Sequence, residues 1–165
     1  MAILTVPSPV GELTLVASDT AVMAVHFPTA RRVPPLPTGE SKSGGDVSPV
    51  LARARRQLEE YFAHARTTFD LPLDPVGSAF QLRVWSALRA IPYGTTLSYS
   101  DLARRLGDVR ATRAVGAANG RNPIPIIVPC HRVVGAHGEL TGFGGGIDRK
   151  RWLLEHEGAL LTLGG

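Results

Sequence analysis

The only cysteine of this 165-residue chain, Cys130, stands in the segment IIVPCHRV between a proline and a histidine. A single cysteine cannot form an internal disulfide, and it supplies too few ligands for a structural zinc. It is therefore either a buried, inert side chain or a nucleophile, and thiols become nucleophilic as thiolates near an imidazole or another positive charge. His131 and Arg132 follow it directly. We interpret Cys130 as a nucleophile and expect these neighbours to stabilise its thiolate.

Two further side chains could serve this thiol. Glu157 falls in the last turn of an expected helix at 148–157, where the helix dipole disfavours an anion, so it needs a cationic or hydrogen-bonding partner. His131 is the candidate, because a carboxylate that orients an imidazole, which in turn deprotonates a thiol, raises nucleophilicity. Asn122 begins a segment with two prolines, which should be rigid and should return its amide beside Cys130. A Glu157 that is simply solvated at a helix end is the alternative.

The elements that must position these residues divide the chain into two parts, joined near residue 76. In the first part, three short apolar runs predict a small antiparallel sheet, and apolar residues at three- and four-residue steps predict a helix at 48–64. The runs cover residues 2–6, 12–18 and 22–27. Residues 28–46 are rich in proline and glycine, which predicts a loop.

The second part reads as mainly helical. A capping-box pattern predicts a helix at 78–91. Ser98 can cap a short helix that is followed by a glycine turn and a second helix at 111–119, the order of a helix-turn-helix. The β-branched residues 126–128 predict a strand that ends just before the thiol. The glycine-rich run at 140–146 predicts a loop that approaches a ligand closely.

Charge is distributed unevenly between the two parts. Residues 1–75 hold 7 Lys and Arg against 8 Asp and Glu, a net charge of −1, whereas residues 76–151 hold 11 against 4, a net charge of +7. A basic second part predicts a polyanion as its partner, with nucleic acid as the leading candidate. In a helix-turn-helix the second helix presents its N-terminal residues to DNA, and Arg110 and Arg113 fall there. An arginine-rich solvated surface is the alternative.

Two global expectations follow from composition. No run approaches the roughly 20 apolar residues of a membrane span, so we expect no membrane contact. The first residues lack the basic start and long apolar stretch of a signal peptide, and a single unpaired thiol fits a reducing compartment. We therefore expect a cytoplasmic protein.

The runs RAVGAANG, NPIPIIVPCHRV, LTGFGGG and RKRWLLEHEG, between about residue 80 and residue 158, closely resemble the O6-alkylguanine-DNA alkyltransferases, or methylated-DNA–protein-cysteine methyltransferases. The resemblance implies an α/β (α+β) fold. Residues 1–76 would form a ribonuclease-H-like sheet-plus-helix domain, and residues 77–165 a helical domain with a winged helix-turn-helix-like motif and the alkyl acceptor. The implied function is DNA repair, in which the alkyl group of O6-alkylguanine, or of O4-alkylthymine, moves irreversibly to the protein's own cysteine. No cofactor and no metal are implied.

The resemblance also implies catalytic roles for five residues. Cys130 accepts the alkyl group, and His131 takes the thiol proton through a water. Glu157 orients His131, and Asn122 orders the loop that carries the thiol. Tyr99 donates a proton toward guanine O6 and crowds the DNA phosphate. The reaction is an in-line displacement with guanine as the leaving group. The thioether formed on Cys130 has no low-barrier route back to the thiol, so each molecule reacts once.

The implied partner is double-stranded DNA, bound through the minor groove by a monomer, with cooperative binding left open. The target base must be flipped out of the stack, and Arg113 would fill the gap it leaves. The DNA-binding residues implied are Arg113, Tyr99, Arg110, Ala114, Ala118, Asn119, Arg121 and Arg132. The residues implied to line the substrate pocket are Pro125, Val133, Phe143 and Gly144.

Three other functions share parts of this pattern. A non-catalytic damage-binding relative would keep the DNA surface but replace the thiol, which Cys130 argues against. A transcription regulator would need a dimerisation or effector domain, and nothing in the sequence resembles one. A cysteine hydrolase would share the thiol, imidazole and carboxylate, but it would turn over an ester and ignore DNA.

Overall fold

A computed structural model of the chain describes residues 1–28 and 47–160. The chain divides into two compact units, Met1–Val76 and Gly77–Gly165. The loop predicted at 28–46 lies, apart from its first residue, outside the described residues. Within the described ranges, no helix is both long and apolar enough to cross a bilayer.

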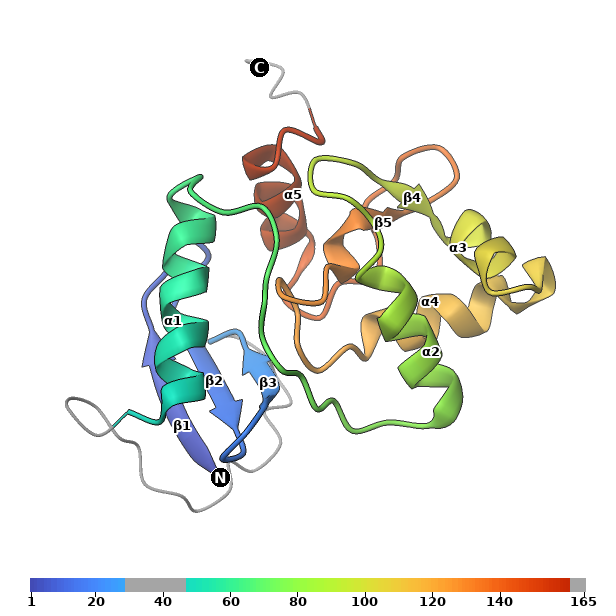
Figure 1. The fold of residues 1–165 in the computed structure, drawn as a ribbon. Coiled ribbons are helices and arrows are strands. Elements are labelled where there is room, and N and C mark those ends of the chain that lie inside the picture. Colours follow the sequence, from blue (N-terminus) through green and yellow to red (C-terminus); the bar gives the residue numbers. More distant parts are fainter. Residues whose placement is uncertain (29–46, 161–165) are drawn as a thin grey trace. The chain divides into compact units, whose positions relative to one another are not determined.

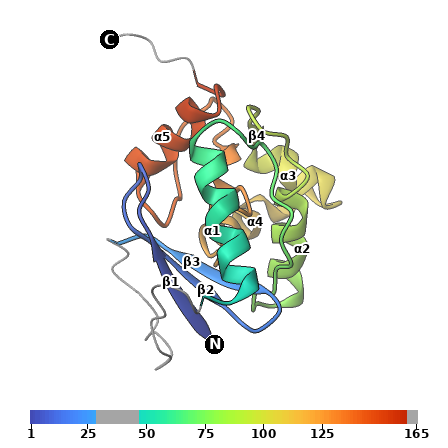
Figure 2. The ribbon, with the colours of Figure 1, turned by 60° about the vertical axis from the view of Figure 1, so that its left-hand side comes forward.

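The first unit is a three-stranded antiparallel sheet covered by one helix (Figures 1 and 2). The strands β1 (Ala2–Val6), β2 (Leu13–Ala17) and β3 (Val22–His26) form a meander in which Leu15 pairs with both Leu4 and Val25. The helix α1 (Pro49–Phe62) begins where Ser48 Oγ accepts a hydrogen bond from the backbone N–H of Leu51. Four of its buried residues recur at helical spacing and face the sheet: Leu51, Ala54, Leu58 and Tyr61. The predicted sheet and helix are confirmed.

The second unit begins with α2 (Ala79–Leu88), which has the predicted capping box. The backbone N–H of Gln81 donates to Ser78 Oγ (3.1 Å), and the backbone N–H of Ser78 donates to Gln81 Oε1 (2.9 Å). Trp85 is buried, and its indole N–H donates to the carbonyl of Ala118 at 2.8 Å. This bond fixes α2 against the helix that contains Ala118.

That helix is the second of the helix-turn-helix. The motif consists of α3 (Tyr99–Arg105), a 3₁₀ turn at Val109–Ala111 and α4 (Thr112–Gly120). Two-residue strands β4 (Leu97–Ser98) and β5 (Val133–Val134) pair in parallel, which brings the first residue of α3 beside the segment that follows the thiol. The fold class predicted from the sequence is confirmed.

The strand predicted at 126–128 is wrong. Its backbone turns instead: Val128 N donates to Ile124 O (2.9 Å), and Ile126 has a φ of +74°, a rare conformation for a β-branched residue. The prolines of this segment lack the amide donors that a sheet ladder needs, so its β-branched residues pack as a buried turn. Cys130 consequently begins a 3₁₀ turn, Cys130–Arg132, rather than ending a strand.

The last described helix is α5 (Ile147–His156), which ends as predicted, with Glu157 at its C-cap and Gly158 in the left-handed conformation at φ +76°. Lys150, Leu153 and Leu154 are its buried residues. α5 packs against the 3₁₀ turn that begins with Cys130. The turn that carries the thiol therefore packs against α5 and α2 of the same unit.

Candidate active site

Cys130 is buried, and hydrogen bonds hold its backbone on both sides. The residue is only 5% exposed. Its N–H donates to Val128 O (2.8 Å), and its carbonyl accepts from Asn119 Nδ2 (3.3 Å). Asn122 holds the preceding turn, because its Nδ2 donates to Val128 O (2.8 Å) and its Oδ1 accepts from the N–H of Ile124 (3.0 Å). These bonds tie Asn122 to the turn that precedes the thiol.

Burial raises the pKa of the Cys130 thiol to about 11, although a hydrogen bond with Asn122 and the positive charge of Lys150 oppose the shift. The expectation of a thiolate stabilised by its neighbours is therefore corrected. Both His131 and Arg132 turn their side chains to Glu157. The resting thiol is protonated, and its reaction requires a base.

This protonation state predicts how the thiol responds to a small alkylating reagent. Because the thiolate fraction grows tenfold per pH unit below the pKa, alkylation of Cys130 by iodoacetamide should keep accelerating up to about pH 10. Mass spectrometry of the Cys130 peptide at pH 7 to 10 measures this rate. A rate that levels off between pH 7 and pH 9 would contradict a raised pKa.

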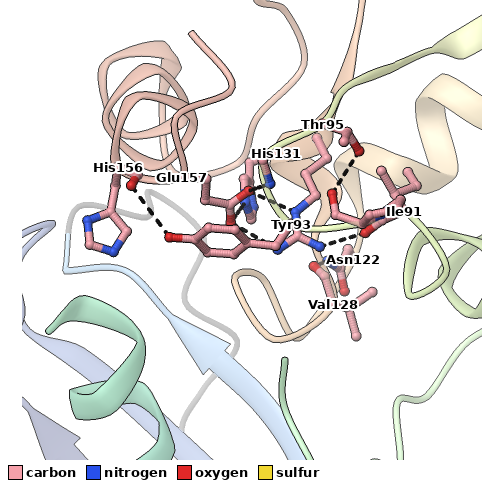
Figure 3. A network of polar contacts seen from close by, with 11 residues as sticks. Ile91, Tyr93, Thr95, Asn122, Val128, His131, His156 and Glu157 are labelled. Carbon is pink, nitrogen blue, oxygen red and sulfur yellow. Dashed lines mark hydrogen bonds and ion pairs between the residues drawn. The ribbon is translucent and has the colours of Figure 1, made fainter. Parts of the chain in front are cut away.

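The candidate base is His131, whose side chain is fully buried and lies against Glu157 (Figure 3). Its Nε2 lies 2.7 Å from Glu157 Oε2. Arg132 grips the same carboxylate with two N–H groups, Nε to Oε1 (2.9 Å) and Nη2 to Oε2 (3.0 Å), and its Nη1 donates to Ile91 O (2.7 Å). The hydroxyl of Tyr93 lies 3.5 Å from the carbonyl of His156, at the end of α5 (Figure 3).

Burial and neighbouring charges determine the protonation states of His131 and Glu157. The pKa of Glu157 is held far below its ordinary range by His131 and Arg132, despite burial, so it is a carboxylate. Burial lowers the pKa of His131, although Glu157 opposes the shift, so the imidazole is neutral near pH 7. A carboxylate at Nε2 requires the proton there, so His131 Nδ1 is the acceptor nitrogen. Nδ1 is buried, and no described residue forms a hydrogen bond with it.

A second polar group joins Tyr99 to Lys150. The hydroxyl of Tyr99 donates to Thr141 O (2.9 Å), and Lys150 Nζ lies 2.7 Å from the same carbonyl and 3.5 Å from the Tyr99 oxygen. Lys150 is fully buried, which lowers its pKa to about 8; only a thiolate at Cys130 would oppose this shift. Burial raises the pKa of Tyr99. We did not identify Lys150 from the sequence, because a lysine between two arginines reads as a solvated helix face.

The predicted DNA-binding residues separate into two groups. Arg113 and Arg110 stand at or just before the start of α4, as predicted. The exposed members are Arg110, Arg113, Ala114 and Arg121, and Tyr99 is half-buried. The buried members are Ala118, Asn119 and Arg132.

The side chains of these three residues are buried and contact other parts of the second unit. Ala118 packs where α2 meets α4, and its carbonyl binds the Trp85 indole. Asn119 supports the backbone of Cys130, and Arg132 pairs with Glu157. Ala118 thus belongs to the packing of α2 on α4, and Asn119 and Arg132 belong to the surroundings of Cys130 and Glu157.

The four residues predicted to line a substrate pocket also differ in exposure. Pro125 and Val133 are buried, Phe143 is half-buried and Gly144 is exposed. The loop that contains Phe143 approaches Tyr99 closely: a Cβ added at Gly142 would lie 3.2 Å from the Tyr99 hydroxyl. A glycine there, at φ +64°, permits this approach.

Comparison with known proteins gives the same family for both units. Residues 79–159 match the family model of the 6-O-methylguanine DNA methyltransferase DNA-binding domain, and residues 3–75 match the model of its ribonuclease-like domain. A protein named methylated-DNA–protein-cysteine methyltransferase from Mycolicibacterium paratuberculosis is 49% identical over 164 residues, 96% of each chain. A constitutive protein of that name from Bacillus subtilis is 42% identical over 154 residues, 93% of each chain. The crystal structure of Mycobacterium tuberculosis OGT in complex with DNA is similar, with a TM-score of 0.86 and 45% identity over 96% of this chain and 94% of that one.

Proposed function

Because the chain belongs to the 6-O-methylguanine DNA methyltransferase family, we propose that it repairs O6-alkylguanine in DNA by transferring the alkyl group to Cys130. One observation supports this assignment above the others. The only thiol of the chain adjoins a neutral His131 whose Nε2 is bound to an ionised Glu157 and whose Nδ1 can accept a proton. A sulfur nucleophile of this kind can displace an alkyl group from oxygen without an oxyanion hole.

In the proposed mechanism the thiol proton of Cys130 passes through a water to His131 Nδ1, and Glu157 stabilises the imidazolium that forms. The sulfur attacks the alkyl carbon in line with the O6–carbon bond. That bond breaks, its electron pair stays on the guanine, and Tyr99 supplies the proton that the leaving guanine needs. A thioether on Cys130 has no low-barrier route back to the thiol, so each molecule acts once. The same displacement would apply to O4-alkylthymine.

DNA recognition in this proposal uses the exposed start of α4. Stacked duplex hides the alkyl carbon, so the damaged nucleotide must be flipped out, at a cost of a few kcal/mol. Arg113 is exposed at the first turn of α4, where it could fill the space left by the base. Minor-groove binding by a monomer suits a search over all sequences, because that groove presents little sequence information. A reducing cytoplasm would keep the thiol available.

The test of this function is a mass measurement. The protein is incubated with a duplex oligonucleotide that contains one O6-methylguanine, and the tryptic peptide that carries Cys130 is analysed. We expect one methyl increment on that peptide and none in Cys130→Ala. Absence of the increment at every salt concentration would reject the function, whereas turnover of an ester substrate with no increment would favour a hydrolase.

Arg113→Ala should separate base flipping from alkyl transfer. Repair of O6-methylguanine in duplex should slow by about tenfold or more, because part of the cost of extrusion is no longer offset. Reaction with free O6-benzylguanine should change less than about twofold, because it needs no extrusion. Arg113→Lys is the matched control: it keeps the charge, so an equally large loss indicates that shape and stacking matter. Equal losses on both substrates would contradict the role.

A further inference from the structure

Arg132, which follows the proposed nucleophile, is a buried arginine whose guanidinium is paired inside the second unit. It is only 6% exposed, and its side chain makes three hydrogen bonds and one cation–π contact. Two of the hydrogen bonds are the fork on Glu157 described above. Of the other contacts, one reaches Ile91 O just beyond α2, and the Cζ atom lies 5.7 Å from the ring centroid of Tyr93. All of its nitrogens therefore point into the unit, away from any surface that DNA could reach.

The carboxylate of Glu157, which Arg132 binds, lies where a negative charge is unfavourable. Glu157 is the C-cap of α5, where the helix dipole is negative, and its side chain is fully buried. A planar guanidinium that donates two parallel hydrogen bonds is the strongest partner a carboxylate can find among side chains. Arg132 supplies this partner and makes the Arg132–Glu157 pair neutral overall.

That neutrality matters for His131, the third member of the cluster. The groups that face the imidazole from the elements around it are Glu157 and Lys150 on α5 and Arg132 on its own turn. Beside a carboxylate without a compensating cation, a buried imidazole would gain a proton, since the pair would then be neutral. If His131 held that proton, it would be an imidazolium. If Glu157 held it, His131 Nε2 would accept and Nδ1 would carry the hydrogen.

In both forms Nδ1 is occupied and cannot receive the thiol proton. From this geometry we propose that Arg132 is a positioning residue, which keeps His131 neutral with Nδ1 as the acceptor by neutralising Glu157. The inference rests on the proposed alkyl transfer to Cys130. In this proposal Arg132 determines the charge of His131 and which of its ring nitrogens carries the proton. The sequence had suggested a DNA contact for Arg132 instead.

The experiment compares wild type with Arg132→Met and Arg132→Lys in single-turnover methyl transfer from a saturating O6-methylguanine duplex at pH 5.5 to 9. The rate constant reports on the active molecules alone, and the final fraction of methylated Cys130 reports on how many molecules are folded. We expect the acidic limb of the rate profile in Arg132→Met to move upward by at least about one pH unit. At pH 6 the rate constant should fall at least tenfold, with a much smaller loss at pH 8.5.

Arg132→Lys keeps the charge but loses the fork, so its acidic limb should lie between those of wild type and Arg132→Met. If Arg132→Met does not fold, the shift of the acidic limb in Arg132→Lys tests the inference by itself. Arg89→Met, an exposed arginine at the end of α2, is the control and should leave the profile unchanged. An unshifted acidic limb in both Arg132 variants, or an equal loss of rate at all pH values, would overturn the inference. Failure of the proposed function looks different, because wild-type Cys130 would then gain no methyl group at any pH.

Discussion

Replacing Glu157 by glutamine should slow methyl transfer to Cys130 by about a hundredfold or more at pH 7.5. The amide cannot stabilise an imidazolium on His131, and general-base catalysis of this kind contributes about 10²–10⁴ in rate. Burial raises the pKa of the thiol to about 11, so the proposed reaction depends on a base, and His131 is the base proposed. Single-turnover kinetics on an O6-methylguanine duplex measure the effect.

The same substitution should also destabilise the protein, because it leaves the buried guanidinium of Arg132 without its anion. Removing one partner of a buried ion pair costs about 3–5 kcal/mol, which urea unfolding would detect. The pKa of Glu157 is depressed in the folded state, so its contribution is complete above the ordinary carboxyl range and is lost as the pH falls below that range. The stability difference between wild type and Glu157→Gln should thus be equal at pH 7 and pH 5.5 and should shrink only at lower pH.

A neighbouring carboxylate provides the control for both measurements. Glu155→Gln, two residues earlier on α5 and half-exposed, should change the rate less than about threefold and the stability by less than about 0.5 kcal/mol. If Glu157→Gln behaved like Glu155→Gln, the His131–Glu157 pair would have no part in the reaction.

Lys150→Met should slow alkyl transfer by about tenfold to a hundredfold without lowering stability. Lys150 provides the ammonium that lowers the pKa of Cys130 and lies within hydrogen-bonding distance of the Tyr99 hydroxyl, so its loss weakens both the nucleophile and the proton donor. Among the described residues no carboxylate forms an ion pair with it. Replacing a buried charge by an apolar side chain of similar volume is often neutral or stabilising, so the free energy of unfolding should not fall by more than about 1 kcal/mol.

Kinetics and urea unfolding of the same preparation give the two values for Lys150→Met. Arg151→Met, the adjacent exposed position on α5, controls for the loss of a positive charge from this helix. A variant that was destabilised but reacted at the wild-type rate would show that Lys150 serves the fold and not the chemistry.

Local patterns predicted much of this fold and its family. The side chains of Ser48, Ser78 and Ser98 cap helices as expected, because an N-cap depends on residues three positions apart and on little else. The resemblance in the PCHRV region led to the family that the comparisons confirm, and the structure brings Glu157, 26 positions further on, to His131.

The errors occur where tertiary structure overrides a local pattern. Residues 126–128 have the composition of a strand, but prolines on both sides and the left-handed backbone of Ile126 make them a buried turn. Arg132 and Lys150 have the side chains of a basic surface, and only the packing of α5 against the thiol turn shows that both are enclosed. Single-sequence patterns carry no information about which charged residue a distant helix will cover.

The enclosure of Cys130 has a consequence for how long an unused molecule survives. Peroxide and glutathione disulfide consume exposed thiolates, and oxidation beyond the sulfenic acid is not readily reversed. A neutral sulfur that is 5% exposed offers these oxidants little to attack. A protein that can react only once thereby keeps its single reactive atom intact until damaged DNA arrives.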